Sequence, residues 1–426
     1  MTTVLAGFIP VGYSRLLMAS TRDKRNVFVL AMCQALFNSG RSLTFLAAAL
    51  TGANMLGEDL RLATLPITMM LIGTAVGTVP SAQLMHWLGR KAGFVISSIV
   101  GTIGAATCMY ALSEGSFLWF NLGIFLFGLY SGAAQQYRFA VADAAPEEFK
   151  AKAISLVLAA GVIGAFVGPE TAGLTKDLIG TNEFIGTFGA LMLFTLASGV
   201  IVLGIDIPRL TRDEYEDSGR PVMEILFQPT AVVAVLAATL GYGVMNFLMT
   251  ATPLAMQVGS EHNFNETKFV IEWHVVGMFA PGFFTGSLIT RFGVLKIITI
   301  GALLQLVAVF VALFGTTVAH FWVSLFLLGI GWNFAFTGGT TLLTKVHTAS
   351  ERAKVQGTND LIVFTGMAFS SLFSGTLYHF LGWQWVNYAA IPIIGLILVA
   401  VICLALSEHR ATRRGMTKPE LPRIDG

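Results

Sequence analysis

Four ionisable side chains interrupt otherwise apolar segments of the sequence, namely Arg41, Glu170, Glu272 and His274. A charge surrounded by hydrocarbon costs several kcal/mol unless it is paired or hydrated, so each such residue is a candidate for function. Carboxylates and imidazoles can also bind and release protons. We therefore predict Glu170, Glu272 and His274 as proton-coupling candidates, and Arg41 as a group that binds a substrate or sets a charge pair. The alternatives are a structural ion pair, Arg41–Glu170 or Arg41–Glu272, and a water-exposed outer vestibule.

The composition indicates that these segments lie in a lipid bilayer. Hydrophobic residues make up 55% of the 426 residues and charged residues 12%, whereas soluble domains carry about 25% charge. The 26 Lys and Arg nearly balance the 24 Asp and Glu, which argues against a nucleic-acid partner. Cys33, Cys108 and Cys403 all lie in apolar runs, which argues against disulfides or a metal site. We expect no cofactor.

Segments of about 20 apolar residues, the length that crosses a bilayer as a helix, recur along the whole chain. They predict an all-α membrane protein with twelve transmembrane helices in two six-helix bundles, at 26–207 and 225–406. A charged linker at 208–224 separates the bundles, and tails lie at 1–25 and 407–426. The predicted spans are 26–50, 60–86, 92–113, 117–142, 151–174, 184–206, 228–256, 268–290, 294–316, 319–345, 354–379 and 383–406.

The basic residues predict the orientation of these spans. If both termini are cytoplasmic, 22 of the 26 Lys and Arg lie on the inner side, and only Arg61, Lys176 and Lys268 lie in outer loops. This distribution follows the positive-inside rule. The four buried ionisable groups then share a layer roughly 22–28 Å from the inner ends of their spans, at about 1.5 Å per residue.

The two halves also repeat each other at an offset of about two hundred residues. Gly89-Arg90-Lys91 corresponds to Gly293 with Lys296, and the stretch 125–129 (FLFGL) corresponds to 326–330 (FLLGI). Lys150-Ala-Lys-Ala corresponds to Arg352-Ala-Lys-Val. Parallel six-helix repeats around a central cavity are typical of secondary transporters.

Two motifs resemble those of the major facilitator superfamily. The stretch 82–91 (AQLMHWLGRK) resembles the family's G-x-L-x-D-R-x-G-R-K loop, with Ala82 for Gly and His86 for Asp. The stretch 164–173 (GAFVGPETAG) resembles the G-x-x-x-G-P-x-x-G-G element associated with antiporters. The resemblance covers essentially the whole chain and implies the family's fold and alternating access. It also implies a cytoplasmic latch, for which we predict Arg90, Lys91, Asp143 and Arg291.

The resemblance places the substrate cavity between spans one, four, seven and ten. Those spans offer amides, hydroxyls and large rings, which suit an uncharged or weakly charged planar organic molecule with polar edges. A site for phosphate or a dicarboxylate would need more basic residues than Arg41 alone. The predicted substrate-binding residues are Gln34, Asn38, Arg41, Gln135, Gln136, Tyr137, Tyr242, Asn246, Trp332, Asn333 and Phe336.

These features predict a secondary transporter of a small organic solute. A receptor would need a soluble signalling module, and an enzyme would need a nucleophile–base–acid set; neither is visible. The sequence also resembles the bacterial riboflavin-type vitamin transporters of the superfamily, which favours uptake of a vitamin. The alternative is a proton-coupled exporter of drugs or siderophores. The expected setting is the bacterial inner membrane, with the small-molecule substrate, protons and the bilayer as partners, and a monomeric protein.

Overall fold

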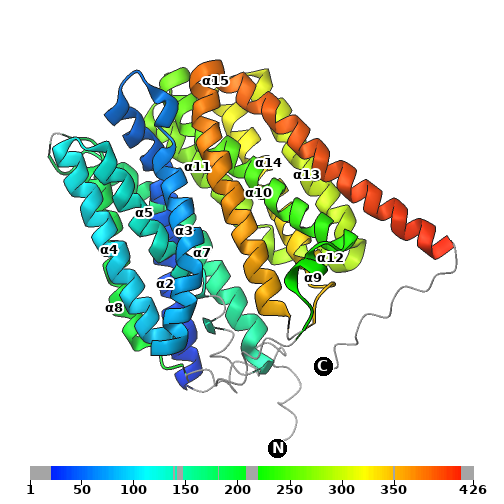
Figure 1. Cartoon of the computed structure of the whole chain (residues 1–426). Coiled ribbons are helices and arrows are strands. Elements are labelled where there is room, and N and C mark those ends of the chain that lie inside the picture. The colour runs from blue at the N-terminus through cyan, green and yellow to red at the C-terminus, as the bar shows by residue number, and fades with distance from the viewer. Residues whose placement is uncertain are drawn as a thin grey trace, which may run out of the picture.

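The computed structural model describes residues 21–137, 140–141, 147–180, 182–207, 219–348 and 351–413. All regular secondary structure in these ranges is helical, which confirms the predicted all-α class. The helices before residue 207 pack mainly against one another, as do those after residue 219. Figure 1 shows the two groups side by side, and we call them the N-half and the C-half.

The described residues of the N-half form six long helices and two short 3₁₀ turns. The 3₁₀ turns are η2 (Leu60–Leu62) and η3 (Val202–Gly204). The helices are α2 (Thr21–Leu56), α3 (Leu65–Leu88), α4 (Arg90–Glu114), α5 (Phe117–Ala134), α7 (Glu147–Thr175) and α8 (Ile185–Ile201).

The C-half begins with a short helix, α9 (Val222–Leu226), at the same end of the molecule as the start of α2 (Figure 1). We call this the linker end, and the opposite end the η2 end. The remaining elements are α10 (Pro229–Leu254), the π-turn η5 (Ala255–Gly259), α11 (Phe264–Phe279), α12 (Gly282–Phe292), α13 (Val294–Phe314), α14 (Val318–Leu343) and α15 (Arg352–Arg413).

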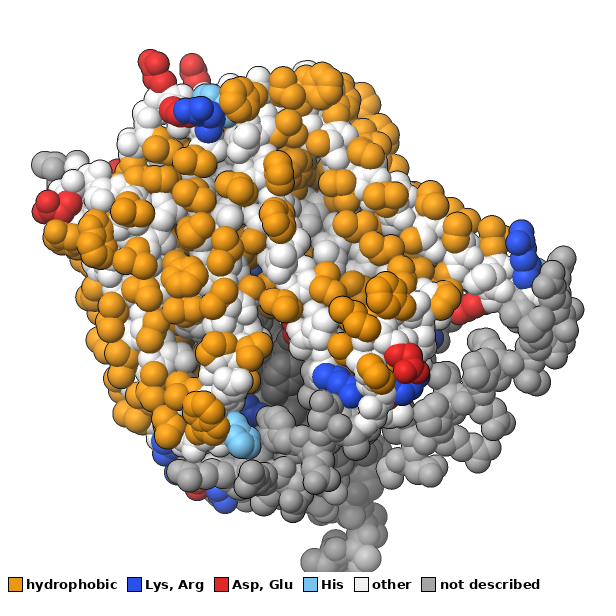
Figure 2. Space-filling model, in the orientation of Figure 1, with side chains coloured by type: hydrophobic (Ala, Val, Ile, Leu, Met, Phe, Trp, Pro, Cys, Tyr) orange, Lys and Arg blue, Asp and Glu red, His pale blue; other side chains and the backbone are white. Residues whose placement is uncertain are grey.

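The described residues form eight helices long and apolar enough to cross a membrane, or nine if the bent pair α11 and α12 is counted as one span. Large apolar side chains such as Leu118 (79% exposed) and Phe314 (82%) cover the outside. Figure 2 shows this hydrophobic surface over most of one face, with charged side chains gathered near the two ends. Such a surface is stable only against lipid, so the protein is an integral membrane protein.

Several elements differ from the predicted spans. Helix α2 begins at Thr21, inside the predicted tail, and α15 extends to Arg413. The predicted span 268–290 bends by 41° between α11 and α12, where Pro281 lacks the N–H that a continuous helix requires. The break predicted between 379 and 383 is present inside α15, because Gly382 has φ 77°, a conformation that favours glycine.

Glycines allow the helices of the N-half to touch backbone to backbone. A Cβ added at Gly73 of α3 would lie 2.4 Å from the Phe125 carbonyl oxygen of α5, and one at Gly128 would lie 2.4 Å from the Met70 oxygen. On α7, Gly164 and Gly168 pack in the same way against Asn38 and Ser39 of α2. Close approach of this kind is a main source of helix association in membranes.

The two halves meet at the η2 end. Thr64 donates a hydrogen bond to the Ser371 carbonyl oxygen over 2.9 Å, and a Cβ on Gly375 would collide with the Thr64 side chain. Farther around the interface, Lys268 of α11 pairs with Glu170 of α7 at 2.9 Å. The N-half and the C-half are therefore joined at this end.

At the linker end, the chain entering the C-half is fixed by one ion pair. The Arg220 guanidinium donates to both oxygens of Glu351 over 2.9 Å and to the Val346 carbonyl oxygen over 3.0 Å. The backbone N–H groups of Arg220 and Thr348 also donate to this buried carboxylate. These hydrogen bonds, led by those from Arg220, hold the pKa of Glu351 well below its ordinary value of 4.5.

We expect Gly73→Ala to destabilise the protein, because the added methyl group meets the α5 backbone, which cannot yield. The expected cost is about 1–3 kcal/mol, seen as a lower thermal unfolding midpoint in detergent. Gly243→Ala in α10 is the matched control, because nothing lies within 4 Å of its added Cβ. It should leave the midpoint unchanged or raise it, since alanine favours helix. An equal loss in both variants would contradict the packing argument.

We expect Glu351→Gln to lower the unfolding midpoint at pH 7. A carboxyl whose pKa is lower in the folded state stabilises that state above its unfolded pKa, and the stabilisation is lost as the pH falls. The difference between the wild type and the variant should therefore stay constant above about pH 5 and shrink steadily below it. A difference that does not depend on pH from 7 to 4 would show that the ion pair does not contribute.

Candidate functional site

A cavity lies between the two halves and consists of two adjoining chambers. The linker-side chamber has an empty volume of about 730 Å³, and the methionine chamber, nearer the η2 end, has about 400 Å³. The linker-side chamber is lined by Gln34, Asn38, Arg41, Gln135, Tyr242, Phe279, Trp332, Phe336, Asp360, Val363 and Phe364. The methionine chamber is lined by Asn38, Arg41, Ser42, Phe45, Tyr242, Met245, Asn246, Met249, Val275, Met278, Phe279 and Met367.

One hydrogen bond crosses between the halves where the chambers join. The Arg41 guanidinium of α2 donates to the Tyr242 hydroxyl of α10 over 2.8 Å, and it lies 5.6 Å from the centre of the Phe45 ring. Among the described residues, Arg41 forms no ion pair with Glu170 or Glu272. A phenol and an aromatic face thus offset its charge, and the remaining guanidinium donors are left for a ligand.

Aromatic rings form one wall of the linker-side chamber. Trp332 and Phe336 of α14 stack with ring centres 5.4 Å apart and planes 10° apart. The Tyr242 ring meets the Trp332 ring edge-on at 4.9 Å and the Phe336 ring at 5.2 Å. Phe279, at the end of α11, is 6.2 Å from Trp332. Such a wall presents flat faces on which a planar ligand can stack.

Two polar atoms at the cavity have no hydrogen-bond partner within the described part of the chain. They are Trp332 Nε1 and Asn246 Oδ1, both buried. The Asn246 amide nitrogen is already used, since it donates to the Met367 carbonyl oxygen and to Ser370 Oγ. Buried polar groups are normally paired, so these atoms can pair with a ligand. Gln34 and Gln135 add two half-buried amides on the linker side.

Three predicted substrate-binding residues lie outside both chambers. Tyr137 is fully buried in the N-half, where its hydroxyl is 3.0 Å from Ser198 Oγ. Gln136 donates to Ser81 of α3. Asn333 donates to the Met278 carbonyl oxygen and accepts from Thr285, which holds α14 against the bend between α11 and α12. Their polar groups are used within one half, and the other eight predicted residues line the cavity.

The three predicted coupling residues do not form one cluster. Glu170 pairs with Lys268 across the halves, and its side chain is 52% exposed. Glu272 is buried, with Oε1 unpaired among the described residues, and it interacts electrostatically with Glu170 and Lys268. His274 is fully buried within the C-half, with Nδ1 2.7 Å from the Leu325 carbonyl oxygen.

The predicted latch is only partly described. Asp143 lies outside the described residues. Lys91 and Arg291 are exposed at the linker end, with the Arg291 guanidinium over the Phe292 ring. Arg90 is half-buried at the same end of the molecule. Its side chain is not free, because it already interacts with a partner.

Sequence reasoning missed most of the methionine chamber. Phe45, Met245, Met278 and Met367 come from four helices that are remote in sequence. Each lies in an apolar run that lipid contact or core packing explains equally well, so no local signal marks them. These four side chains line one chamber only because the two halves pack against each other.

The arrangement is that of a membrane transporter, in which a ligand cavity lies between two helical bundles joined at one end. The family model of the Major Facilitator Superfamily matches residues 27–280 and 261–422, and the chain belongs to this family. This confirms the resemblance seen in the sequence and identifies a transporter rather than an enzyme.

Two bacterial relatives cover nearly the whole chain. The riboflavin transporter RfnT of Brucella anthropi is 40% identical over 385 residues, which are 90% of this chain and 96% of the relative. An uncharacterised transporter of the superfamily from Bacillus subtilis, YdeG, is 28% identical over 88% of this chain and 89% of its own. In fold, the chain is similar to the crystal structure of PepTSo, a transporter of the POT family. The TM-score is 0.72 at 12% identity, covering 91% of this chain and 98% of that one.

We expect Arg41→Ala and Tyr242→Phe to act non-additively on stability. Each removes the same hydrogen bond, so the double variant should lose less than the sum of the two single losses. The expected coupling is about 1.5–3 kcal/mol, as for a hydrogen bond to a charged group. Unfolding midpoints of the four proteins in detergent measure it. Strict additivity would mean that the bond contributes nothing in the resting protein.

Proposed function

We propose that this protein carries riboflavin, or a flavin very similar to it, into the bacterial cell across the inner membrane. The observation that carries the proposal is the 40% identity to a riboflavin transporter over 90% of the chain. The cavity chemistry supports it independently. An isoalloxazine ring is planar and uncharged at neutral pH, and its carbonyl edge can accept hydrogen bonds from amides and from a guanidinium.

We propose twelve membrane spans for this transporter. The eight long apolar helices, with α15 divided at Gly382 and the bent pair counted as one, supply ten spans. Helices α2 and α7 supply the other two; α2 is less apolar because it carries Gln34, Asn38 and Arg41 toward the cavity. We place the boundary between the six-span bundles 26–207 and 225–406 in the charged linker 208–224. The tails 1–25 and 407–426 then lie in the cytoplasm, as the basic residues require.

This topology makes the described conformation inward-facing. The η2 end becomes the outer end, and there the halves are joined by the Thr64–Ser371 and Glu170–Lys268 contacts. The larger, more polar chamber lies on the cytoplasmic side. A monomer suffices for this mechanism, because each chain holds its own cavity between its two halves. The latch residues Arg90, Lys91, Asp143 and Arg291 would join the halves on the inner side when the outer end opens.

Among the three coupling candidates, we propose Glu272 as the proton carrier. Glu170 is neutralised by Lys268, and His274 is fully buried in the C-half, outside both chambers. Glu272 is buried, has one oxygen unpaired among the described residues, and lies beside the interface that must open. A buried carboxyl beside a moving interface can take up a proton on one side and release it on the other as its hydration changes.

Uptake of radiolabelled riboflavin into proteoliposomes tests the proposed substrate. The wild type should take it up saturably, and unlabelled riboflavin should compete. Arg41→Ala should lower uptake at least tenfold, because a hydrogen bond to a charged group is worth about 1.5–3 kcal/mol. Lys296→Ala, outside the cavity at the start of α13, is the control and should transport normally. Failure to take up or exchange riboflavin would overturn the proposal, and selective release of drugs or siderophores would favour the exporter.

A pH gradient tests the proposed coupling. An inward proton gradient should drive accumulation of riboflavin by the wild type. Glu272→Gln should abolish this accumulation yet retain exchange of riboflavin across the membrane, because substrate still binds while no proton is carried. His274→Ala should remain coupled. Wild-type uptake that is indifferent to the gradient would mean a facilitator or another ion.

A further inference from the structure

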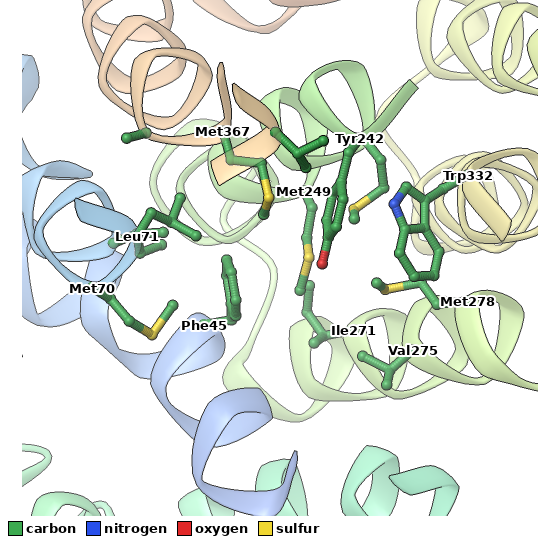
Figure 3. Close-up of a cluster of buried hydrophobic side chains, with 14 of the residues drawn as sticks. Phe45, Met70, Leu71, Tyr242, Met249, Ile271, Val275, Met278, Trp332 and Met367 are labelled. Carbon is green, nitrogen blue, oxygen red and sulfur yellow. The ribbon is translucent and has the colours of Figure 1, made fainter. Parts of the chain in front are cut away.

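The methionine chamber differs sharply in chemistry from the linker-side chamber that it adjoins. Four thioethers and two phenyl rings line it, supplied by α2, α10, α11 and α15. Figure 3 shows Phe45, Met249, Met278 and Met367 pointing toward one common space beside the Tyr242 hydroxyl. Val275 is apolar too, and the side chains with polar groups are those of Asn38, Arg41, Ser42, Tyr242 and Asn246.

This composition is suited to an apolar ring. Methionine side chains are unbranched and polarisable, so they adapt to a flat surface and make favourable sulfur–aromatic contacts. A polar substituent placed among the four methionines would lose its water and gain only weakly accepting thioethers in return. The exception is Asn246 Oδ1, an acceptor that is already buried and unpaired among the described residues.

The position of Arg41 fixes which end of a ligand enters the methionine chamber. Arg41 and Tyr242 line both chambers, so a ligand long enough to occupy both must pass beside them. Its hydrogen-bond acceptors will lie at the guanidinium, where a ligand oxygen can replace the Tyr242 hydroxyl as the acceptor. A flavin has both kinds of end, because one end of its ring system is a cyclic imide with two carbonyls and the other is a dimethylbenzene.

We propose that the methionine chamber is the subsite for the dimethylbenzene end of the flavin and selects against polar groups at that end. The inference rests on the proposed function, since it assigns the orientation of the same substrate. The imide edge lies at Arg41, between the chambers. The ribityl chain extends into the linker-side chamber, toward the amides of Gln34 and Gln135.

Competition by flavin analogues altered only at the benzenoid end tests this orientation. Inhibition of labelled riboflavin uptake would be measured for unlabelled riboflavin, for its 7,8-didemethyl analogue and for an analogue with an amino group in place of the 8-methyl. For the wild type, the amino analogue should be at least tenfold weaker than riboflavin, as expected when a hydrophobic pocket must desolvate a polar group. The didemethyl analogue should lie between them.

Two variants place polar groups in the chamber. Met249→Gln should reduce the wild-type preference for riboflavin over the amino analogue at least fivefold, and Val275→Thr should reduce it less, since it adds only one hydroxyl. The matched controls are Met256→Gln and Val270→Thr. Both residues are fully buried on neighbouring stretches of the same half and line neither chamber, so the preference should be unchanged. Gln135→Ala should weaken all three compounds alike.

The outcomes separate the two proposals. If riboflavin is transported but Met249→Gln and Val275→Thr keep the wild-type preference, the subsite is wrong and the proposed substrate stands. If the Met249→Gln protein fails to insert into the membrane, the preference measured for Val275→Thr decides whether the subsite is correct. If the wild type does not transport riboflavin at all, the proposed function fails and the subsite fails with it.

Discussion

The structure depends on how one half-buried guanidinium is accommodated. Arg41 lies midway along α2, inside the protein, and it faces Tyr242 of the other half rather than a carboxylate. A guanidinium held by a neutral hydroxyl and an aromatic face keeps much of its capacity to bind another acceptor. A salt bridge would have used up that capacity, because charged pairs in apolar surroundings are expensive to separate. The cavity is therefore built around a charge whose present partner a substrate oxygen can replace.

The contacts within the N-half are more rigid than some of those between the halves. Inside the N-half, glycines bring α3 and α5 into backbone contact, and no small adjustment can loosen such an interface. Between the halves, the contacts at the η2 end include the close packing of Gly375 against Thr64, the buried Thr64–Ser371 hydrogen bond and the Glu170–Lys268 pair. The Glu170 carboxylate is half-exposed, so water can replace Lys268 as its partner at little cost. We propose that the molecule opens along the plane that contains the cavity while each bundle moves as a unit.

Much of the fold follows from the sequence, because the lipid environment imposes length and hydropathy on every span. The break near Gly382 and the position of Arg41 inside an apolar span were predictable for that reason. The bend at Pro281 was not, because hydropathy continues through it. The partners of Arg41, Tyr137 and Asn333 were also beyond local sequence reasoning, since each partner lies tens to hundreds of residues away. Tyr137 and Asn333 have the right chemistry for a cavity, yet folding uses their polar groups inside one half.

We propose that substrate binds at the point where Arg41 bridges the two halves. A structure of the protein determined with riboflavin bound would test this position. We expect a flavin carbonyl oxygen within hydrogen-bond distance of the Arg41 guanidinium, in place of the Tyr242 hydroxyl, and the dimethylbenzene end of the ring among the methionines. A flavin bound elsewhere, with the Arg41–Tyr242 hydrogen bond intact, would contradict it.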